Sequence, residues 1–249
     1  HGGIQYVSYG EFDATDHIGN VEGTFKAAEY AFVLGAGKQL YERMSVGANL
    51  KFITSSFESY RSSGITGDLA AIFHDTVNQL NFTLLFKNIG GQLTTYTEDN
   101  REPVPFEMQA GISKRLKYLP FRFSFIYQYL NRWNILYDDP NSEEDSFFFD
   151  PSFAPEDKYA WLDNLARHLI FNGEFLMGKK ENFRLRFGYN HLRKKELSVR
   201  NLRSLAGFSM GIGLKINRFR VEFGRSFVHL GAGANHFSIS TNLKEFTKG

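Results

Sequence analysis

The side chains able to do acid–base or metal chemistry are scattered in this sequence. None of the seven histidines falls in a spacing such as His-Glu-x-x-His, in which one helix face presents two ligands to zinc. No Gly-x-Ser-x-Gly turn surrounds a serine, so no hydrolase nucleophile is indicated. Cysteine is absent, which excludes thiol catalysis and cysteine zinc sites. We therefore expect a protein without catalytic residues, metal or cofactor.

A set of charged side chains recurs between apolar neighbours. In residues 121–129, 183–190 and 219–224, aromatic or aliphatic residues alternate with arginine, serine, glutamate or other mostly polar residues. Successive side chains of a strand point to opposite faces, so these charges would share one face. They either line an anion-selective pore or ligand cavity, or fill the interior of a closed sheet with salt bridges. The predicted charge cluster comprises Arg122, Arg184, Arg186, Arg220 and Glu222.

One segment, from about 135 to 165, is long, acidic and rich in aromatic residues. Loops of this length are usually functional or disordered, and exposed aromatics suit protein interfaces. We expect a partner-docking surface here, with a short helix over 157–166. The alternative is that its three consecutive phenylalanines plug a barrel mouth or join an aromatic girdle. The predicted partner contacts are Trp133, Tyr137, Phe147, Phe148, Phe149 and Trp161.

Apolar residues recur at every second position along most of the chain, which predicts strands. Most of the segments have ten or more residues, and a tilted membrane strand needs about nine to eleven. The twelve predicted strands cover residues 2–14, 23–40, 43–59, 63–74, 78–89, 104–115, 119–134, 166–178, 182–193, 204–215, 218–228 and 234–244. These segments predict an all-β fold, an antiparallel up-and-down transmembrane β-barrel in a single domain over residues 1–249.

The connections between these strands alternate in length. The even-numbered ones are short, at about 41–43, 74–77, 115–118, 178–181 and 216–218, whereas the odd-numbered ones are mostly longer, at about 90–104, 135–165 and 194–203. In outer-membrane barrels short turns face the periplasm and long loops face outward. The pattern therefore predicts a bacterial outer-membrane protein with its long loops extracellular.

The composition agrees with a lipid-facing sheet. Aromatic residues make up 16% of the chain, yet the mean hydropathy is −0.33, as expected where only alternate residues touch lipid. Lysine and arginine number 29 against 27 acidic residues, so nothing indicates a nucleic-acid partner.

Several stretches resemble the PorQ family of outer-membrane proteins, which belongs to the type IX secretion system of Bacteroidota. The resemblance covers nearly the whole chain. The stretches are Gly-Gly-Ile-Gln-Tyr-Val-Ser-Tyr-Gly at 2–10, Asp-Asn-Leu-Ala-Arg-His at 163–168, Leu-Arg-Ser-Leu-Ala-Gly-Phe at 202–208, Gly-Arg-Ser-Phe at 224–227 and Asn-His-Phe-Ser-Ile-Ser-Thr-Asn-Leu at 235–243.

The resemblance implies a barrel similar to PorV and the FadL-like transporters, with about fourteen strands. An N-terminal segment of at least two strands would then be missing from this chain. It also implies a non-enzymatic anchor that holds the surface protein PorZ beside PorU and PorV in the attachment complex. The alternative functions are FadL-like transport of hydrophobic compounds and an outer-membrane enzyme.

Overall fold

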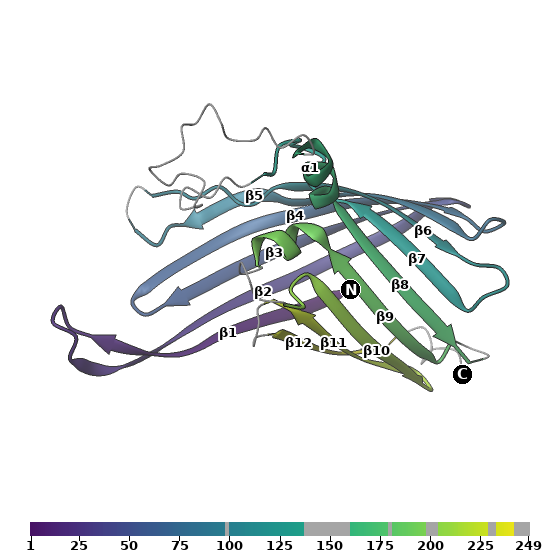
Figure 1. Ribbon diagram of the computed structural model, residues 1–249. Helices are drawn as coiled ribbons and strands as arrows, with labels where there is room; N and C mark the ends of the chain where they lie inside the picture. Colours follow the sequence, from purple (N-terminus) through teal and green to yellow (C-terminus); the bar gives the residue numbers. More distant parts are fainter. Residues whose placement is uncertain (98–99, 137–159, 179–180, 198–203, 229–232, 242–249) are drawn as a thin grey trace, which may run out of the picture. The chain divides into compact units, whose positions relative to one another are not determined.

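The fold is a single antiparallel sheet. The computed structural model describes residues 1–97, 100–136, 160–178, 181–197, 204–228 and 233–241. In these residues twelve strands pair in sequence order, β1 to β12, without a crossover (Figure 1). This is the up-and-down topology of a β-barrel, and it confirms the fold class predicted from the alternating segments.

The element boundaries are as follows. The strands are β1 Gly2–Thr15, β2 Val21–Tyr41, β3 Met44–Phe57, β4 Tyr60–Asp75, β5 Leu80–Thr94, β6 Glu107–Arg115, β7 Phe121–Tyr127, β8 Leu169–Met177, β9 Phe183–Asn190, β10 Phe208–Ile216, β11 Phe219–Phe227 and β12 Gly233–Thr241. The helices are α1 Ala160–His168, before β8, and α2 His191–Glu196, after β9. Neither helix has the length and apolar character required to cross a membrane, within the described ranges.

The chain divides into two compact units that share the strand order. The first contains residues 1–75 and 82–109, and the second contains residues 76–81 and 110–249. The single barrel domain over residues 1–249 stays a prediction.

The first unit carries apolar and polar side chains on opposite faces of β1 to β5. On β2, Phe32 and Leu34 are exposed, as expected for one face of an alternating strand. On the other face, Asp68 of β4 lies opposite Asn49 of β3, and Lys51 follows Asn49 two residues later on the same face. The Lys51 Nζ lies 2.7 Å from Asp68 Oδ1, so charges on this face are paired within the sheet.

The second unit repeats this division on β7 to β12. Its apolar face is a continuous surface, because the register aligns Ile212 with Phe223 and Phe223 with Phe237. These three side chains are 47%, 48% and 67% exposed. The opposite, polar face carries the arginines and glutamates of β7, β8, β9 and β11.

Burial is inverted relative to a water-soluble β-sandwich. Among the described residues, the side chains below 2% exposure with the largest volume are His168 and Thr66, both polar. Large apolar side chains are instead exposed along both units. Leaving an apolar surface of this extent in water is costly, so the apolar faces require a non-aqueous environment or a partner.

Several predicted boundaries are wrong, and two of them have a local reason. The third connection is a tight turn of residues 58 and 59, because β3 and β4 stay paired up to Phe57 and Tyr60. The ninth predicted strand extends to 193, but α2 begins at His191. Asn190 caps that helix, since its Oδ1 accepts a hydrogen bond from Arg193 N at 3.1 Å, a known function of asparagine at this position.

Candidate functional site

Helix α1 is fastened to the chain that follows β7. Asn164, which is only 3% exposed, donates from Nδ2 to Trp133 O at 2.8 Å and accepts from Ile135 N at 3.1 Å. The buried side-chain amide of Asn164 thus binds the backbone of two residues, Trp133 and Ile135, in the segment that follows β7. The two ends of the long seventh connection are therefore joined before β8 begins.

His168, the last residue of α1, completes this fastening. It has no exposed surface. Its Nδ1 lies 2.7 Å from Gln128 O and its Nε2 lies 2.9 Å from Trp133 O. Both partners are carbonyl oxygens, which only accept hydrogen bonds, so a ring N–H of His168 donates to the backbone of residues 128–133.

Aromatic rings enclose the same histidine. The Tyr127 ring stacks on it at 4.7 Å with a 4° angle, and the Trp133 ring stacks at 5.6 Å with a 21° angle. Gln128, which is also buried, donates from Nε2 to Arg167 O at 2.8 Å. We call the assembly of residues 128–136 with α1 the platform.

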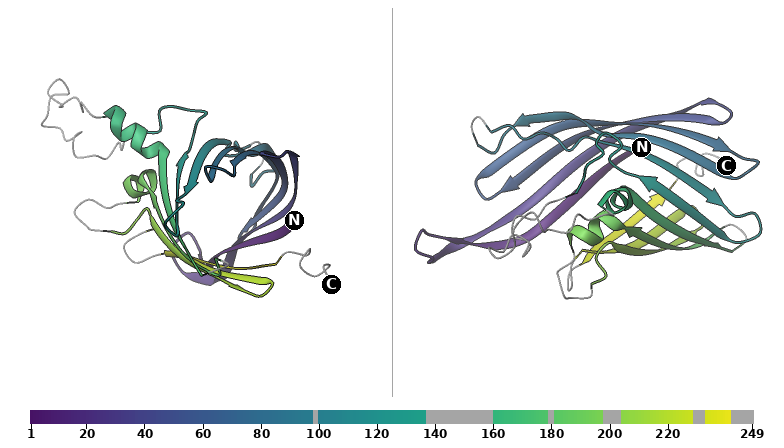
Figure 2. Two further views of the ribbon diagram at one scale, coloured as in Figure 1. Left: turned by 90° about the vertical axis from the view of Figure 1, so that its right-hand side faces the viewer. Right: turned by 45° about the horizontal axis from the view of Figure 1, so that its top comes forward.

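Asp163 links the platform to α2. Its carboxylate accepts from Arg167 Nε at 2.8 Å, and lies 3.2 Å from both His191 Nε2 and Lys195 Nζ. Figure 2 shows α1 and α2 side by side where β8 begins and β9 ends. Burial opposes ionisation of Asp163, but the hydrogen bonds from Arg167, His191 and Lys195 outweigh it and lower the pKa to about 2.

The depressed pKa of Asp163 predicts an acid-sensitive link between the helices. Its stabilising effect is complete above the ordinary carboxyl pKa of 3.8 and is lost as pH falls through about 2. Replacing Asp163 with Asn should therefore lower the free energy of unfolding by up to about 2 kcal/mol at pH 5. Urea unfolding followed by tryptophan fluorescence measures this difference between pH 5 and pH 2. A difference that stays constant down to pH 2 would contradict the assignment.

The platform exposes large apolar side chains. Trp133 and Trp161 are 57% and 59% exposed, although the backbone of Trp133 is held by buried groups. Leu136 and Leu162 are exposed nearby in the sequence. Of the predicted partner contacts, these two tryptophans are present on the platform, and Tyr137 and Phe147 to Phe149 lie outside the described residues. The predicted short helix over 157–166 corresponds to α1.

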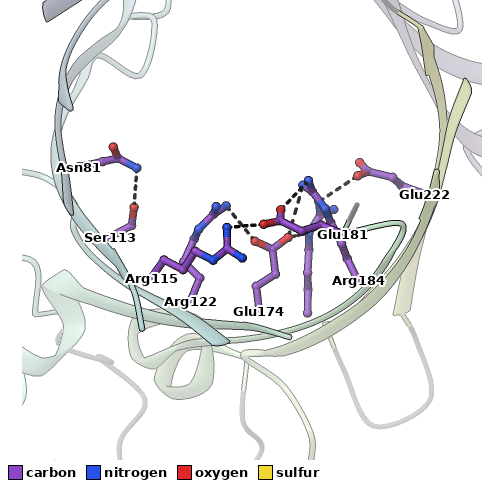
Figure 3. A network of polar contacts seen from close by, with 9 residues as sticks. Asn81, Ser113, Arg115, Arg122, Glu174, Glu181, Arg184 and Glu222 are labelled. Carbon is purple, nitrogen blue, oxygen red and sulfur yellow. Dashed lines mark hydrogen bonds and ion pairs between the residues drawn. The ribbon is translucent and has the colours of Figure 1, made fainter. Parts of the chain in front are cut away.

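The polar face of the second unit holds the predicted charge cluster. Figure 3 shows Arg122 and Arg184 near Glu174, which was not among the predicted residues, and Glu222 farther along the same face. The register places Arg122 and Arg186 directly opposite Glu174 on the two neighbouring strands. Opposite charges at such positions stabilise a sheet.

Distances define how the charges pair. Arg122 Nη1 lies 3.1 Å from Glu174 Oε2, and Arg186 Nε lies 2.9 Å from Glu174 Oε1. The Arg186 Nη2 also lies 2.9 Å from Glu222 Oε1. Arg184 lies farther away, at 3.8 Å from Glu174. Four of the five predicted residues are therefore brought together around Glu174 or Glu222.

Three further residues define the extent of this cluster: Glu181, Arg115 and Arg220. Glu181 pairs with Arg115 and lies 3.6 Å from Arg184 Nη2, and neither was predicted. Arg220 shares a face of β11 with Glu222 but has no ion pair to any described residue. Detecting Glu174, Glu181 and Arg115 requires the register and turn geometry, which alternation alone does not provide.

The described residues contain no group of three histidine, aspartate or glutamate side chains able to hold a metal ion. The chain matches no protein-family model. No curated protein matches it either.

Proposed function

We propose that this chain is a non-enzymatic β-barrel of the bacterial outer membrane that anchors a surface protein. The proposal rests on one combination of features: the sheet exposes an apolar face, and the platform exposes two tryptophans. An apolar face suits lipid, and exposed tryptophans on a rigid base suit a protein interface. The two α-helices follow the odd-numbered strands β7 and β9, and the proposal takes these connections to face outward, as long loops do in outer-membrane barrels.

The PorQ-family resemblance gives the proposal its finer form. In that form the chain is a component of the type IX secretion system, and its platform holds a PorZ-like protein beside PorU and PorV. The proposal needs a docking surface whose shape is fixed before the partner arrives. Asn164 and His168 supply that rigidity, since they hold the base of the platform through buried hydrogen bonds.

Transport of hydrophobic compounds is less well supported. A passage for such compounds requires an apolar lining. An apolar molecule that covers charged side chains removes their water without replacing its hydrogen bonds, which is costly. The polar face of the second unit instead carries Arg122, Arg186 and Glu174 in close ion pairs. This chemistry favours the anchoring function.

Replacing Trp161 with Ser should weaken surface-partner recovery about thirtyfold. Truncating a central interface tryptophan costs about 2 kcal/mol or more, and each 1.4 kcal/mol changes an affinity tenfold. The measurement is capture of the partner by tagged full-length protein from detergent-solubilised envelopes. Tyr118→Ser is the matched control, because Tyr118 is 89% exposed and lies in the β6–β7 turn, away from the platform.

A larger change tests the whole surface. Deleting residues 138–157 should leave the heat-modifiable gel mobility of the barrel unchanged and abolish partner recovery. Full recovery of the partner by both this deletion and Trp161→Ser would exclude the platform as the docking surface.

A further inference from the structure

A cavity of about 630 Å³ lies on the polar face of the second unit. It extends over β6 to β12 and is distinct from the platform. Pockets that hold small molecules have volumes of about 300–1,000 Å³. The cavity is therefore large enough for a small molecule.

Small residues form the floor of this cavity. The register sets Ser209 opposite both Gly188 and Ser226, and Gly211 opposite Gly224. A Cβ atom on Gly188 would lie only 2.5 Å from Ser209 Oγ. Absence of side chains at these positions thus keeps the hydroxyl groups accessible and the space open.

The lining offers polar groups without internal partners. Ser124, Asn172, Ser209, Ser226 and Ser238 line the cavity, and their side chains form no hydrogen bond with any other described residue. Hydroxyl and amide groups are donors to oxyanions. Five uncommitted groups around one space indicate a site for a polar ligand rather than for an apolar one.

The charge of the cavity is positive on balance. Arg122, Arg184, Arg186 and Arg225 line it, against Glu174 and Glu222. Among the three arginines around Glu174, Arg184 is the least compensated, because its carboxylate contacts are 3.8 and 3.6 Å, longer than a hydrogen bond. Its buried Nε also has no hydrogen-bond partner in the described residues. An anion would supply the missing negative charge.

We propose that this cavity binds a small oxyanion, such as the phosphate or carboxylate group of a soluble molecule. Guanidinium groups recognise both through paired N–H···O bonds. The ligand is a soluble molecule and not a lipid headgroup, because the cavity opens on the polar face, opposite the side that carries Phe237 and Ile239. Arg184 supplies the main charge, and Ser209 and Ser226 supply neutral donors.

The test uses full-length protein in detergent micelles and inorganic phosphate as the probe. Isothermal titration with phosphate is compared with sodium chloride at equal ionic strength. We expect saturable phosphate binding that Arg184→Gln weakens at least about tenfold, since a hydrogen bond to a charged group contributes about 1.5–3 kcal/mol. The exposed Arg61, in the first unit, gives the control Arg61→Gln, which should bind normally.

A second variant keeps the test decisive if Arg184→Gln does not fold. Ser209→Ala with Ser226→Ala removes two donors without changing charge, and should weaken phosphate binding about tenfold. Phosphate heats equal to those of chloride would overturn the proposal. Unchanged binding by a folded Arg184→Gln variant, or by the double serine variant, would also overturn it.

Discussion

Replacing Glu174 with Gln is expected to lower the free energy of unfolding by about 3 kcal/mol. Glu174 is 13% exposed on its side chain and lies within 4 Å of Arg122, Arg184 and Arg186. The substitution keeps the shape of the side chain but leaves three guanidinium groups facing one another without their shared counter-charge. Urea unfolding of the refolded protein in detergent, followed by gel mobility, measures the loss.

Two glutamates provide the controls for this prediction. Glu222 pairs with Arg186 alone at short distance, so Glu222→Gln should cost about a third as much. Glu58, exposed in the β3–β4 turn, should tolerate Gln with no measurable change. Equal effects at Glu174 and Glu58 would show that the cluster does not stabilise the sheet.

Replacing His168 with Phe should destabilise the platform by about 2 kcal/mol. The ring stacking with Tyr127 and Trp133 can persist, but the Gln128 carbonyl oxygen loses its contact with the ring and the Trp133 carbonyl oxygen keeps only the hydrogen bond from Asn164. Each unsatisfied buried polar group costs about 1–3 kcal/mol. Trp161→Phe leaves Trp133 as the only tryptophan of the chain, so its fluorescence reports directly on the change.

The matched control is His17→Phe, because His17 lies exposed in the β1–β2 turn. We expect the His168→Phe variant to show a shifted Trp133 emission and an earlier loss of that signal in urea. The His17→Phe variant should match its parent. Identical urea profiles for both variants would refute the role of His168 in holding the platform.

The twelve strands could be predicted from the sequence because alternation is a local property. Each of β1 to β12 overlaps a segment of alternating residues. Their ends were less predictable. Tyr129 adopts a positive φ of 56°, and β7 ends before it at Tyr127, whereas apolar alternation continues to about 134. The two-residue β3–β4 turn was not predicted, because polar residues occur both in strands and in the turns that connect them.

The site was predictable only in part, for a related reason. Arginines between aromatic residues identify the polar face, so Arg122, Arg184 and Arg186 were found. Their partner Glu174 becomes evident only once the register of β7, β8 and β9 is known. The role of His168 is a tertiary property too, since its contacts Gln128 and Trp133 are 40 and 35 residues away.

Full-length protein purified from cell envelopes tests whether this chain is a membrane barrel that anchors a surface protein. Gel mobility is compared with and without boiling, and co-purified proteins are identified by mass spectrometry. We predict outer-membrane fractionation, faster migration of the unboiled protein, and a co-purified surface protein that Trp161→Ser loses. Recovery in the soluble fraction, with one mobility before and after boiling, would contradict the claim.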